Sequence, residues 1–514
     1  MTRFKIAVAV VMSLSVQSLL AQTPPPQQVP PPTQQVPPPP QQTTPPQTPP
    51  PAAGQPAPAA VPMVPQAVVP APMVKSPLPT GRVTYRTLIE VNSELEWLAK
   101  ANPARVRRFE LPHKSVLGQT VYGFEITHDV NVSSGKPVFL MTGLHHAREW
   151  PTVELTMEFI YDLLKNDGTD PEITGLLDQV RFIAVPVVNV DGYEMSRSLL
   201  IEQKRRNCRV SAEKFITFAD CANPANRGLG VDLNRNYGAF WGGSGASVSP
   251  TGDSHRGPSP FSEPEVQNIR EIMSSNQVVV ALSNHTPDAK VLRAPSANEE
   301  PIPADIEPYD ALAQLLGGDL KWEAGPWPKI YYTASGTMEE QAYYSAGTFA
   351  FTFENAPGQR SFHPPYAFVI DQYLGTGAYP GSSARAGYLR LLRSAADAKL
   401  HSVLDVKAPA GATLTLHKSF SMDTSPLLLN DNARDTARGA ALTFTQTLDS
   451  KFVVPADTKQ VTWHVNPSLR PSQHAQEFLQ EAWALTCSWK GKSQTVNVMV
   501  KRGETTQVDV SRCR

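Results

Sequence analysis

The pattern of hydrophobic and polar positions divides most of the chain into two regions of different texture. From residue 83 onward, apolar runs of strand length alternate with stretches in which apolar residues recur at helical spacing. Helices are predicted over 85–100 and after Pro151 and Pro264, since a proline often opens a helix. Strands are predicted over 106–111, 121–126, 138–141, 180–190, 278–282 and 348–353. This alternation predicts an α/β domain over 83–400, with a mixed, mostly parallel twisted sheet flanked by helices.

After residue 400 the pattern changes to short or alternating runs separated by Gly-, Asn-, Asp- and Lys-rich turns. Strands are predicted over 413–416, 442–448, 461–465, 483–487, 496–500 and 506–510. Such spacing predicts a β-sandwich-like domain over 401–514. Cys487 and Cys513 are a candidate disulfide within it. His417, His464 and His474 have no metal-ligand spacing, so we expect them on its surface.

The N-terminal residues have the pattern of a secretory signal. Arg3 and Lys5 precede an apolar core over 6–20, and Ala21 is small enough for cleavage, so the signal is predicted over 1–21. An uncleaved anchor is the alternative, but the run is short and contains polar residues. Residues 22–82 are rich in Pro and Gln and are predicted to form a disordered, polyproline-like spacer. We therefore expect a protein secreted to an extracellular or periplasmic, oxidising compartment, with no transmembrane span after signal removal.

The composition limits the classes of partner that the protein is expected to bind. The net charge is −1 and charged residues make up 18% of the chain, so no polybasic surface indicates nucleic acid as a partner. The spacer and the C-terminal domain are the segments that would associate with a cell wall or another surface. The chemistry has to come from the α/β region.

Three groups capable of metal or acid–base chemistry follow apolar strands in that region. His146, His285 and Glu354 each lie just past the end of a predicted strand. Open α/β sheets bind ligands at the carboxyl ends of their strands, so we expect these groups to meet. Glu149 follows His146 by three residues, a spacing that turns two ligand atoms toward one point, although H-x-x-E alone is a weak signal.

Six motifs in order resemble the zinc carboxypeptidase family that includes pancreatic carboxypeptidases A and B. The similarity extends from about residue 85 to residue 395. The motifs are H-A-R-E-W at 146–150, N-V-D-G-Y at 189–193, V-D-L-N-R-N-Y at 231–237, S-E-P-E at 262–265, I-Y-Y-T-A-S-G at 330–336 and F-T-F-E at 351–354. The family sequence N-P-D-G-Y differs only at Val190.

The resemblance implies one zinc ion on His146, Glu149 and His285, the two-histidine, one-glutamate set of carboxypeptidase A. Such a set leaves a coordination position for water, and zinc polarises the scissile carbonyl. His145 is adjacent to His146 but lacks a glutamate at the family spacing. We therefore expect it to pack beside the site or support a ligand.

The resemblance also implies the reacting groups. Glu354 is expected to be the general base, and burial at the end of a strand would raise its pKa. Arg205 resembles the arginine that stabilises the oxyanion of the tetrahedral intermediate. The family sequence W-R-K-x-R is replaced by K-R-R-N-C at 204–208, so Arg206 competes for this role.

An exopeptidase must recognise a free α-carboxylate, for which a guanidinium is well suited. Asn234 and Arg235 match the family's carboxylate-binding pair, and Tyr332 matches the tyrosine that closes over the substrate. Arg148, within the first motif, is expected to line the site.

Glu339 lies where the family places the residue that selects the C-terminal side chain, which favours lysine or arginine ends. Glu340 follows it, so a shift of one residue would exchange them, and both are equally interpretable as acids at a helix start. Thr286-Pro287-Asp288 departs from the family's usual Ser-Tyr. Cys208 and Cys221 lie in the loop where pancreatic members carry a disulfide.

The resulting hypothesis is a secreted zinc metallocarboxypeptidase acting on the C-termini of peptides and proteins. One alternative is a cell-wall peptidase of the same family that cuts peptidoglycan stem peptides, which the spacer mildly supports. The other is a non-catalytic binding protein on this fold, which predicts the loss of a ligand or of the base. His146, Glu149, His285 and Glu354 are all present.

Overall fold

The structure is a computed structural model that describes residues 75–213, 215–355, 361–431 and 437–513. The predicted signal over 1–21 and the predicted spacer up to residue 74 lie outside these residues. Within the described ranges, no helix combines the length and the apolar character needed to cross a membrane.

The predicted α/β domain contains one mixed eight-stranded sheet in the order β1-β2-β4-β3-β5-β8-β6-β7. Strands β4, β3, β5 and β8 are parallel neighbours, whereas β1, β2 and the β6–β8 pair run antiparallel. The mixed sheet is as predicted. The strands are β1 (Val106–Glu110), β2 (Tyr122–Ile126), β3 (Val138–Gly143), β4 (Arg181–Val185), β5 (Val278–His285), β6 (Lys290–Arg293), β7 (Glu323–Pro326) and β8 (Phe349–Glu354).

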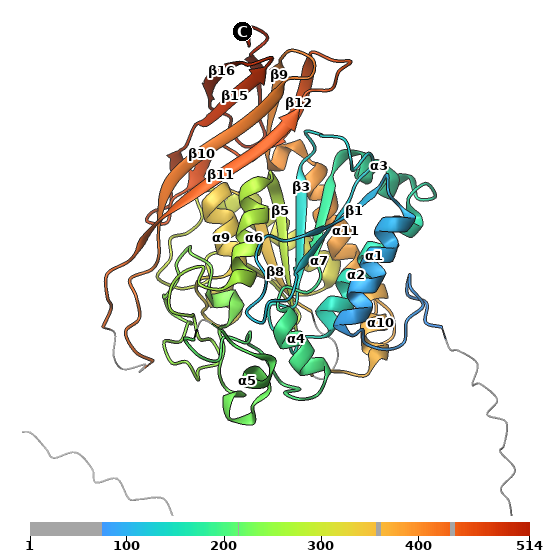
Figure 1. The fold of residues 1–514 in the computed structure, drawn as a ribbon, viewed down its shortest axis with the longest axis vertical. Coiled ribbons are helices and arrows are strands. Elements are labelled where there is room, and N and C mark those ends of the chain that lie inside the picture. Colours follow the sequence, from blue (N-terminus) through green and yellow to red (C-terminus); the bar gives the residue numbers. More distant parts are fainter. Residues whose placement is uncertain (1–74, 214, 356–360, 432–436, 514) are drawn as a thin grey trace, which may run out of the picture. The chain divides into compact units, whose positions relative to one another are not determined.

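Helices cover both sides of this sheet, with α6 and α9 on one side and α2, α7 and α11 on the other (Figure 1). The main helices are α1 (Leu88–Ala101), α2 (Pro151–Asn166), α3 (Pro171–Gln179), α4 (Val190–Arg197), α6 (Pro264–Ser275), α7 (Ile306–Leu320), α9 (Met338–Ala346), α10 (Tyr366–Leu374) and α11 (Ala384–Ala396). Short helices are α5 (Phe218–Ala222), α8 (Trp327–Ile330) and the 3₁₀ turns Pro224–Asn226, Leu233–Arg235 and Ala398–Leu400.

The hydrophobic pattern explains these elements. Every residue of β3, β5 and β8 is buried, as expected for central strands covered on both faces. Helix α2 begins at Pro151 as predicted. The strand predicted over 180–190 ends early, at Val185, because Asn189 caps a helix instead: its Oδ1 accepts a hydrogen bond from the backbone N–H of Gly192. The expected turn is therefore the start of α4.

The last residues of the predicted spacer are described and pack on the α/β domain. Leu78 is only 3% exposed and belongs to the main hydrophobic core. Thr80 donates from its backbone N–H and its hydroxyl to Glu158, and Arg82 pairs with Glu90 and Glu94. Residues 76–82 thus pack on the α/β domain, although their composition resembles the residues before them.

The C-terminal region forms a β domain in which two sheets share one core. Its sheets have the orders β11-β10-β15-β16 and β12-β9-β17, and residues of both lie in a single hydrophobic cluster. Strand β9 and the small β13–β14 pair were not predicted, and β9 and β17 are parallel. The strands are β9 (Ser402–Lys407), β10 (Thr413–Asp423), β11 (Thr443–Val453), β12 (Gln460–Val465), β13 (Leu469–Pro471), β14 (Phe478–Gln480), β15 (Trp483–Trp489), β16 (Lys492–Val498) and β17 (Thr505–Asp509).

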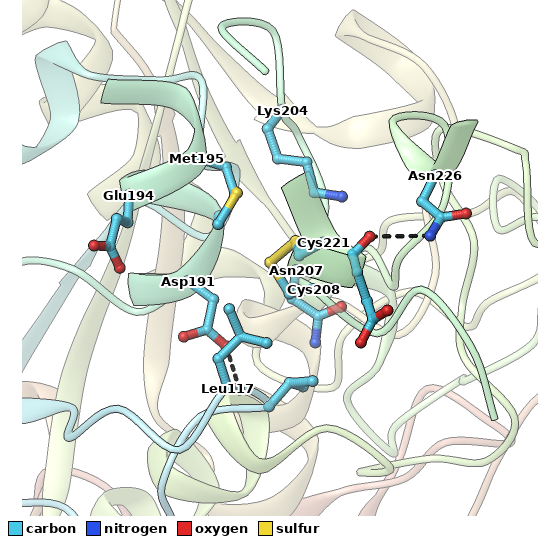
Figure 2. The surroundings of a disulfide bond; sticks show 12 residues. Leu117, Asp191, Glu194, Met195, Lys204, Asn207, Cys208, Cys221 and Asn226 are labelled. Atoms are coloured by element: carbon cyan, nitrogen blue, oxygen red, sulfur yellow. Dashed lines mark hydrogen bonds between the residues drawn. A yellow bond between two sulfur atoms is a disulfide. The ribbon is translucent and has the colours of Figure 1, made fainter. Parts of the chain in front are cut away.

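The two predicted cysteine pairs differ. Cys208 and Cys221 form a disulfide that ties the segment after Arg206 to α5 (Figure 2). Cys487 and Cys513, by contrast, are free thiols buried in the second core, so the expectation of a bridge between them is wrong for this structure. Burial and the neighbouring Cys513 raise the pKa of Cys487 to about 12, so this thiol is protonated near pH 7.

One of the three expected surface histidines is also placed differently. His417 and His474 are exposed and lie beside Asp449 and Asp423. His464 is half-buried, and its Nδ1 lies 2.7 Å from Nε2 of the buried His401.

Candidate metal centre and substrate site

The strand register brings the predicted metal and acid–base groups together. Gly143 at the end of β3 is opposite Asn284 of β5, and His285 is opposite Glu354 of β8. His146 and Glu149 lie on the turn between β3 and α2. The carboxyl ends of three adjacent parallel strands therefore carry the groups, as the sequence predicted.

Three of these side chains point their ligand atoms at one another. Nδ1 of His146 lies 2.7 Å from Oε1 of Glu149 and 3.0 Å from Nδ1 of His285. Nδ1 of His285 is 3.1 Å from Oε2 of Glu149. All three side chains are buried, and their ligand atoms fall within 4.8 Å of one another.

The outer ring nitrogens of both histidines have partners that the sequence analysis did not assign. Nε2 of His146 lies 3.1 Å from Oδ1 of Asp232, and the Ser283 hydroxyl is 2.9 Å from Nε2 of His285. Such contacts fix the ring orientation and leave Nδ1 free to bind a cation. The signal for Asp232 was its place two residues before Asn234 in a matched motif, whereas nothing marked Ser283.

The protonation states suit a ligand set. Burial lowers the pKa of His285 to about 4, so its imidazole is neutral near pH 7. Burial alone would raise the pKa of Glu149, but His146 and His285 outweigh it and lower the pKa of this carboxyl. Burial likewise opposes ionisation of Asp232, but Arg205 and His146 hold its pKa well below the usual range.

This donor set fits a zinc ion. Imidazole nitrogen and carboxylate oxygen are both ligands that zinc accepts, and three protein ligands are the number found in catalytic zinc sites. Without a cation, two Nδ1 atoms 3.0 Å apart would face each other and a carboxylate in a buried space, which is unfavourable. Within the described residues, this is the one such group of three or more histidine, cysteine or acidic side chains.

Glu354 ends β8 beside this set and is 3% exposed. Burial and the nearby carboxylates of Glu149 and Asp288 raise its pKa well above the usual range, although Arg205 and Arg235 oppose the shift. Asp288 accepts a hydrogen bond from the Tyr331 hydroxyl at 2.5 Å. It comes from the segment that departs from the family pattern.

The structure separates the two competing arginines. Arg205 donates through Nε and Nη2 to Oδ2 of Asp232, and its Nη1 is 3.9 Å from Oε1 of Glu149. Arg206 turns away and donates to the backbone carbonyls of Pro250, Gly252 and Gly228. Arg205 is therefore the arginine at the site, and Arg206 holds neighbouring loops.

Asn234 and Arg235 lie beside the histidines on the 3₁₀ turn Leu233–Arg235. The Arg235 guanidinium donates from Nε to the Gly245 carbonyl at 3.1 Å and from Nη1 to the Asn234 carbonyl at 2.7 Å. Tyr332 is 44% exposed, and its ring centre is 5.9 Å from the Arg235 guanidinium carbon. These three predicted residues thus lie together, with Tyr332 at the solvent side.

Arg148 and His145 flank the centre. The Arg148 guanidinium lies over the Phe362 ring at 4.2 Å, and its buried Nε has no hydrogen-bond partner among the residues described. His145 is fully buried, with Nε2 2.8 Å from the Tyr237 hydroxyl and Nδ1 3.2 Å from the Ser283 hydroxyl. His145 therefore packs behind the ligands, as expected.

The two adjacent acids have different surroundings. Glu339 accepts from the Thr352 hydroxyl at 3.0 Å and lies 3.4 Å from the Ser296 hydroxyl. Thr352 is two residues before Glu354 on β8, so the two side chains share a face of the strand. Glu340 instead accepts from the backbone N–H of Thr337 and completes the capping box of α9. Glu339 is therefore the acid beside the site, and burial raises its pKa.

Comparisons with known proteins identify related sequences. A sequence model described as zinc carboxypeptidase matches residues 91–374. The chain is 31% identical over 281 residues to carboxypeptidase A2 of Mus musculus. These residues are 52% of this chain and 62% of the relative. It is 26% identical over 296 residues to carboxypeptidase A1 of Sus scrofa, covering 56% of this chain and 66% of the relative.

A solved structure has a similar fold. Carboxypeptidase A of Helicoverpa armigera superposes with a TM-score of 0.52 at 25% identity, covering 61% of this chain and 74% of that one. The thrombin activatable fibrinolysis inhibitor, at 22% identity and a TM-score of 0.52, covers 61% of this chain and 75% of its own and shows the fold alone. The matched part of the chain therefore covers 62% of the length of carboxypeptidase A2.

Proposed function

Because the chain belongs to the zinc carboxypeptidase family, we propose that it hydrolyses the last peptide bond of peptides and proteins. The observation that carries this proposal is the convergence of His146, Glu149 and His285 next to a buried glutamate and an arginine. These three side chains would hold one zinc ion. When bound, zinc supplies Lewis-acid chemistry that polarises a carbonyl oxygen and makes water more acidic.

Glu354 would act as the general base. Its carboxylate would accept a proton from the attacking water and pass it to the leaving amine nitrogen. Its raised pKa supports this role, because an unshifted glutamate would be too weak a base to remove that proton efficiently.

Arg205 would stabilise the developing oxyanion. Asp232 holds the Nε and Nη2 side of its guanidinium, which leaves Nη1 directed toward the metal ligands. A preorganised charge of this kind stabilises a transition state without further reorganisation.

Asn234 and Arg235 would bind the free α-carboxylate of the substrate, with Tyr332 covering it and Arg148 lining the approach. Two backbone carbonyls hold Nε and Nη1 of the Arg235 guanidinium, which orients this group for contact with a carboxylate. An internal peptide bond offers no such carboxylate, so the proposed activity is limited to C-terminal ends.

Glu339 would favour a lysine or arginine side chain at the substrate's C-terminus. Its carboxylate lies beside Thr352 on the strand that carries Glu354. A cationic side chain entering there would lower its pKa and pair with it.

Secretion is part of the proposal. It rests on the signal-like residues 1–21 and on the Cys208–Cys221 disulfide, which is typical of proteins in oxidising compartments. The Pro-rich segment and the β domain would serve for association with a wall or surface.

Mass spectrometry of a peptide panel tests the reaction. Peptides ending in Phe, Leu, Lys, Arg and D-Ala would be incubated with the protein, with and without a zinc chelator, and C-terminally amidated copies would be the control. We expect chelator-sensitive loss of one residue from Lys and Arg ends and none from the amides. A Glu339→Gln variant should lose the preference for basic ends. Cleavage of the D-Ala peptide alone would favour the wall peptidase, and no cleavage would contradict the proposal.

A further inference from the structure

The β10–β11 connection of the C-terminal domain reaches the loop that supports Arg235. This connection is described over 424–431 and 437–442, and it descends beside the α/β domain (Figure 1). The loop it contacts, residues 242–249, is called the clamp loop here because its Gly245 carbonyl accepts from Nε of Arg235 at 3.1 Å.

Asp431 makes the densest contact between the two segments. Its Oδ1 accepts from the backbone N–H of Val248 at 2.8 Å. Its Oδ2 accepts from the Ser247 hydroxyl at 2.6 Å and the Ser249 N–H at 3.1 Å. One carboxylate thus fixes three successive residues of the clamp loop, and hydrogen bonds to a charged acceptor are stronger than neutral ones.

Other contacts hold the first half of the clamp loop. The Leu428 N–H donates to the Gly242 carbonyl at 2.8 Å, and Arg438 Nη2 donates to the Ser244 hydroxyl at 2.9 Å. The approach is close, since a Cβ on Gly243 would lie 2.6 Å from the Ser425 hydroxyl oxygen. The clamp loop is therefore held at both ends by the C-terminal domain.

The clamp loop has little freedom on its other side. Gly245 has φ +81°, and a Cβ there would lie 2.0 Å from the Thr333 carbonyl oxygen. Thr333 follows Tyr332, so the loop packs directly on the segment that carries the covering tyrosine. A shift of the clamp loop would move the acceptor of Arg235 and press on this segment.

We infer that the C-terminal β domain is part of the substrate-carboxylate site, with Asp431 acting as a positioning residue for Arg235 through the clamp loop. This inference rests on the proposed role of Arg235. Asp431 touches no substrate. It fixes the Gly245 carbonyl, which in turn orients the guanidinium.

Steady-state kinetics of Asp431→Ala test the inference, with Asp449→Ala as the matched control. Asp449 is an exposed acid of the same domain whose contact is with His417. We expect KM for the best panel peptide to rise about threefold to tenfold in Asp431→Ala, the size of a partly lost hydrogen bond to a charged group. Its kcat should stay within about twofold, because the lost term is ground-state binding. Asp449→Ala should match the wild type.

Two further variants separate positioning from folding. Asp431→Asn keeps one carbonyl acceptor, so its KM should lie between those of the wild type and Asp431→Ala. Ser247→Ala removes one of the three hydrogen bonds and should raise KM less than Asp431→Ala while retaining the fold. A lower melting temperature with an unchanged KM in these variants would overturn the inference, as would an Asp431→Ala variant whose KM equals that of Asp449→Ala.

A binding measurement distinguishes this failure from failure of the proposed reaction. If the wild type cleaves nothing, calorimetry would compare a peptide with a free C-terminus against its amide. A wild type that cleaves nothing can still bind the peptide with the free carboxylate more tightly than the amide. If this preference is smaller in Asp431→Ala, the result would support the inference. No preference in the wild type would overturn both.

Discussion

One cluster of buried charge precedes α2 and another includes Glu154 and Glu158 of that helix, and the two accommodate buried charge differently. Around Arg86, one guanidinium meets Glu94 at 3.0 Å, Glu158 at 3.2 Å and also Glu154. Around His146, two imidazoles and Glu149 direct their ligand atoms at each other, with Arg205 at the edge.

The difference lies in where the cation comes from. The Arg86 cluster contains its own cation, and the backbone N–H groups of Thr80 and Arg86 donate to the carboxylate oxygens of Glu158 and Glu154 that the guanidinium does not contact. Such a closed network stabilises the fold and leaves nothing to bind. The His146 cluster lacks a central cation from the chain, so it favours one from solution. A buried charge network that contains its own cation stabilises the fold, whereas one without a central cation is suited to bind a metal ion.

The largest expected effect comes from Glu354→Gln, which keeps the shape of the side chain and removes the proton acceptor. We expect kcat to fall by about 10²–10⁴, the usual contribution of a general base. The measurement is kcat on the best panel peptide, and the control is the melting temperature, which should not fall. A variant that keeps kcat within a few-fold of the wild type would show that another group takes the proton.

Replacing Arg86 by Met tests whether the Arg86 cluster stabilises the fold. It leaves buried carboxylates without their cation, and such losses cost about 3–5 kcal/mol of unfolding free energy. Urea denaturation measures this, while kcat per folded molecule should be unchanged. The matched control is Arg393→Met, which breaks an exposed pair with Glu172 and should cost at most about 1 kcal/mol. Equal costs for the two variants would contradict the assignment of Arg86 to stability.

The Cys208–Cys221 disulfide supports the His146 cluster, because Cys208 closely follows Arg205 and Arg206 in the sequence. Its removal in a Cys208→Ala, Cys221→Ala variant should lower the free energy of unfolding by about 3 kcal/mol, on the chain-entropy model. Urea denaturation with and without reductant checks this: reductant should destabilise the wild type but not the variant. Equal sensitivity to reductant would contradict it.

Glu265 is a buried acid with no cation in contact among the described residues. Burial, Asp191 and Glu263 raise its pKa to about 8, against 4.5 ordinarily. The unfolded chain therefore loses this proton near pH 4.5 and the folded chain near pH 8. Its contribution to stability is full below about pH 4.5 and is lost as the pH rises through about 8.

A pH series of melting temperatures for the wild type and Glu265→Gln tests this sign. Between pH 5 and 8 the wild type should lose stability relative to the variant, because glutamine does not ionise. Parallel curves would contradict the shift.

Sequence alone predicted the parts of the site that depend on local order along the chain. His146, His285 and Glu354 follow apolar strands, and the rule that parallel strands present their carboxyl ends at one edge was enough to bring them together. The family resemblance added Glu149, Arg205, Asn234 and Arg235, which the structure places beside them.

The rest depends on contacts that no spacing encodes. Ser283 lies inside a strand, where an isolated serine carries no signal for its contact with His285. The Asp431 contact joins residues 183 positions apart, through a connection whose path is set by the register of β10 and β11. Arg86 resembles any helix-flanking arginine until Glu154 and Glu158 are seen around it.

We predict that the His146 cluster binds a cation and that the Arg86 cluster does not. Elemental analysis of zinc per chain after dialysis tests it most directly, for the wild type, His285→Ala and Glu158→Gln. We predict one zinc per chain in the wild type and in Glu158→Gln, and none in His285→Ala. Retention of zinc by His285→Ala, or its absence from the wild type after zinc loading, would contradict the account.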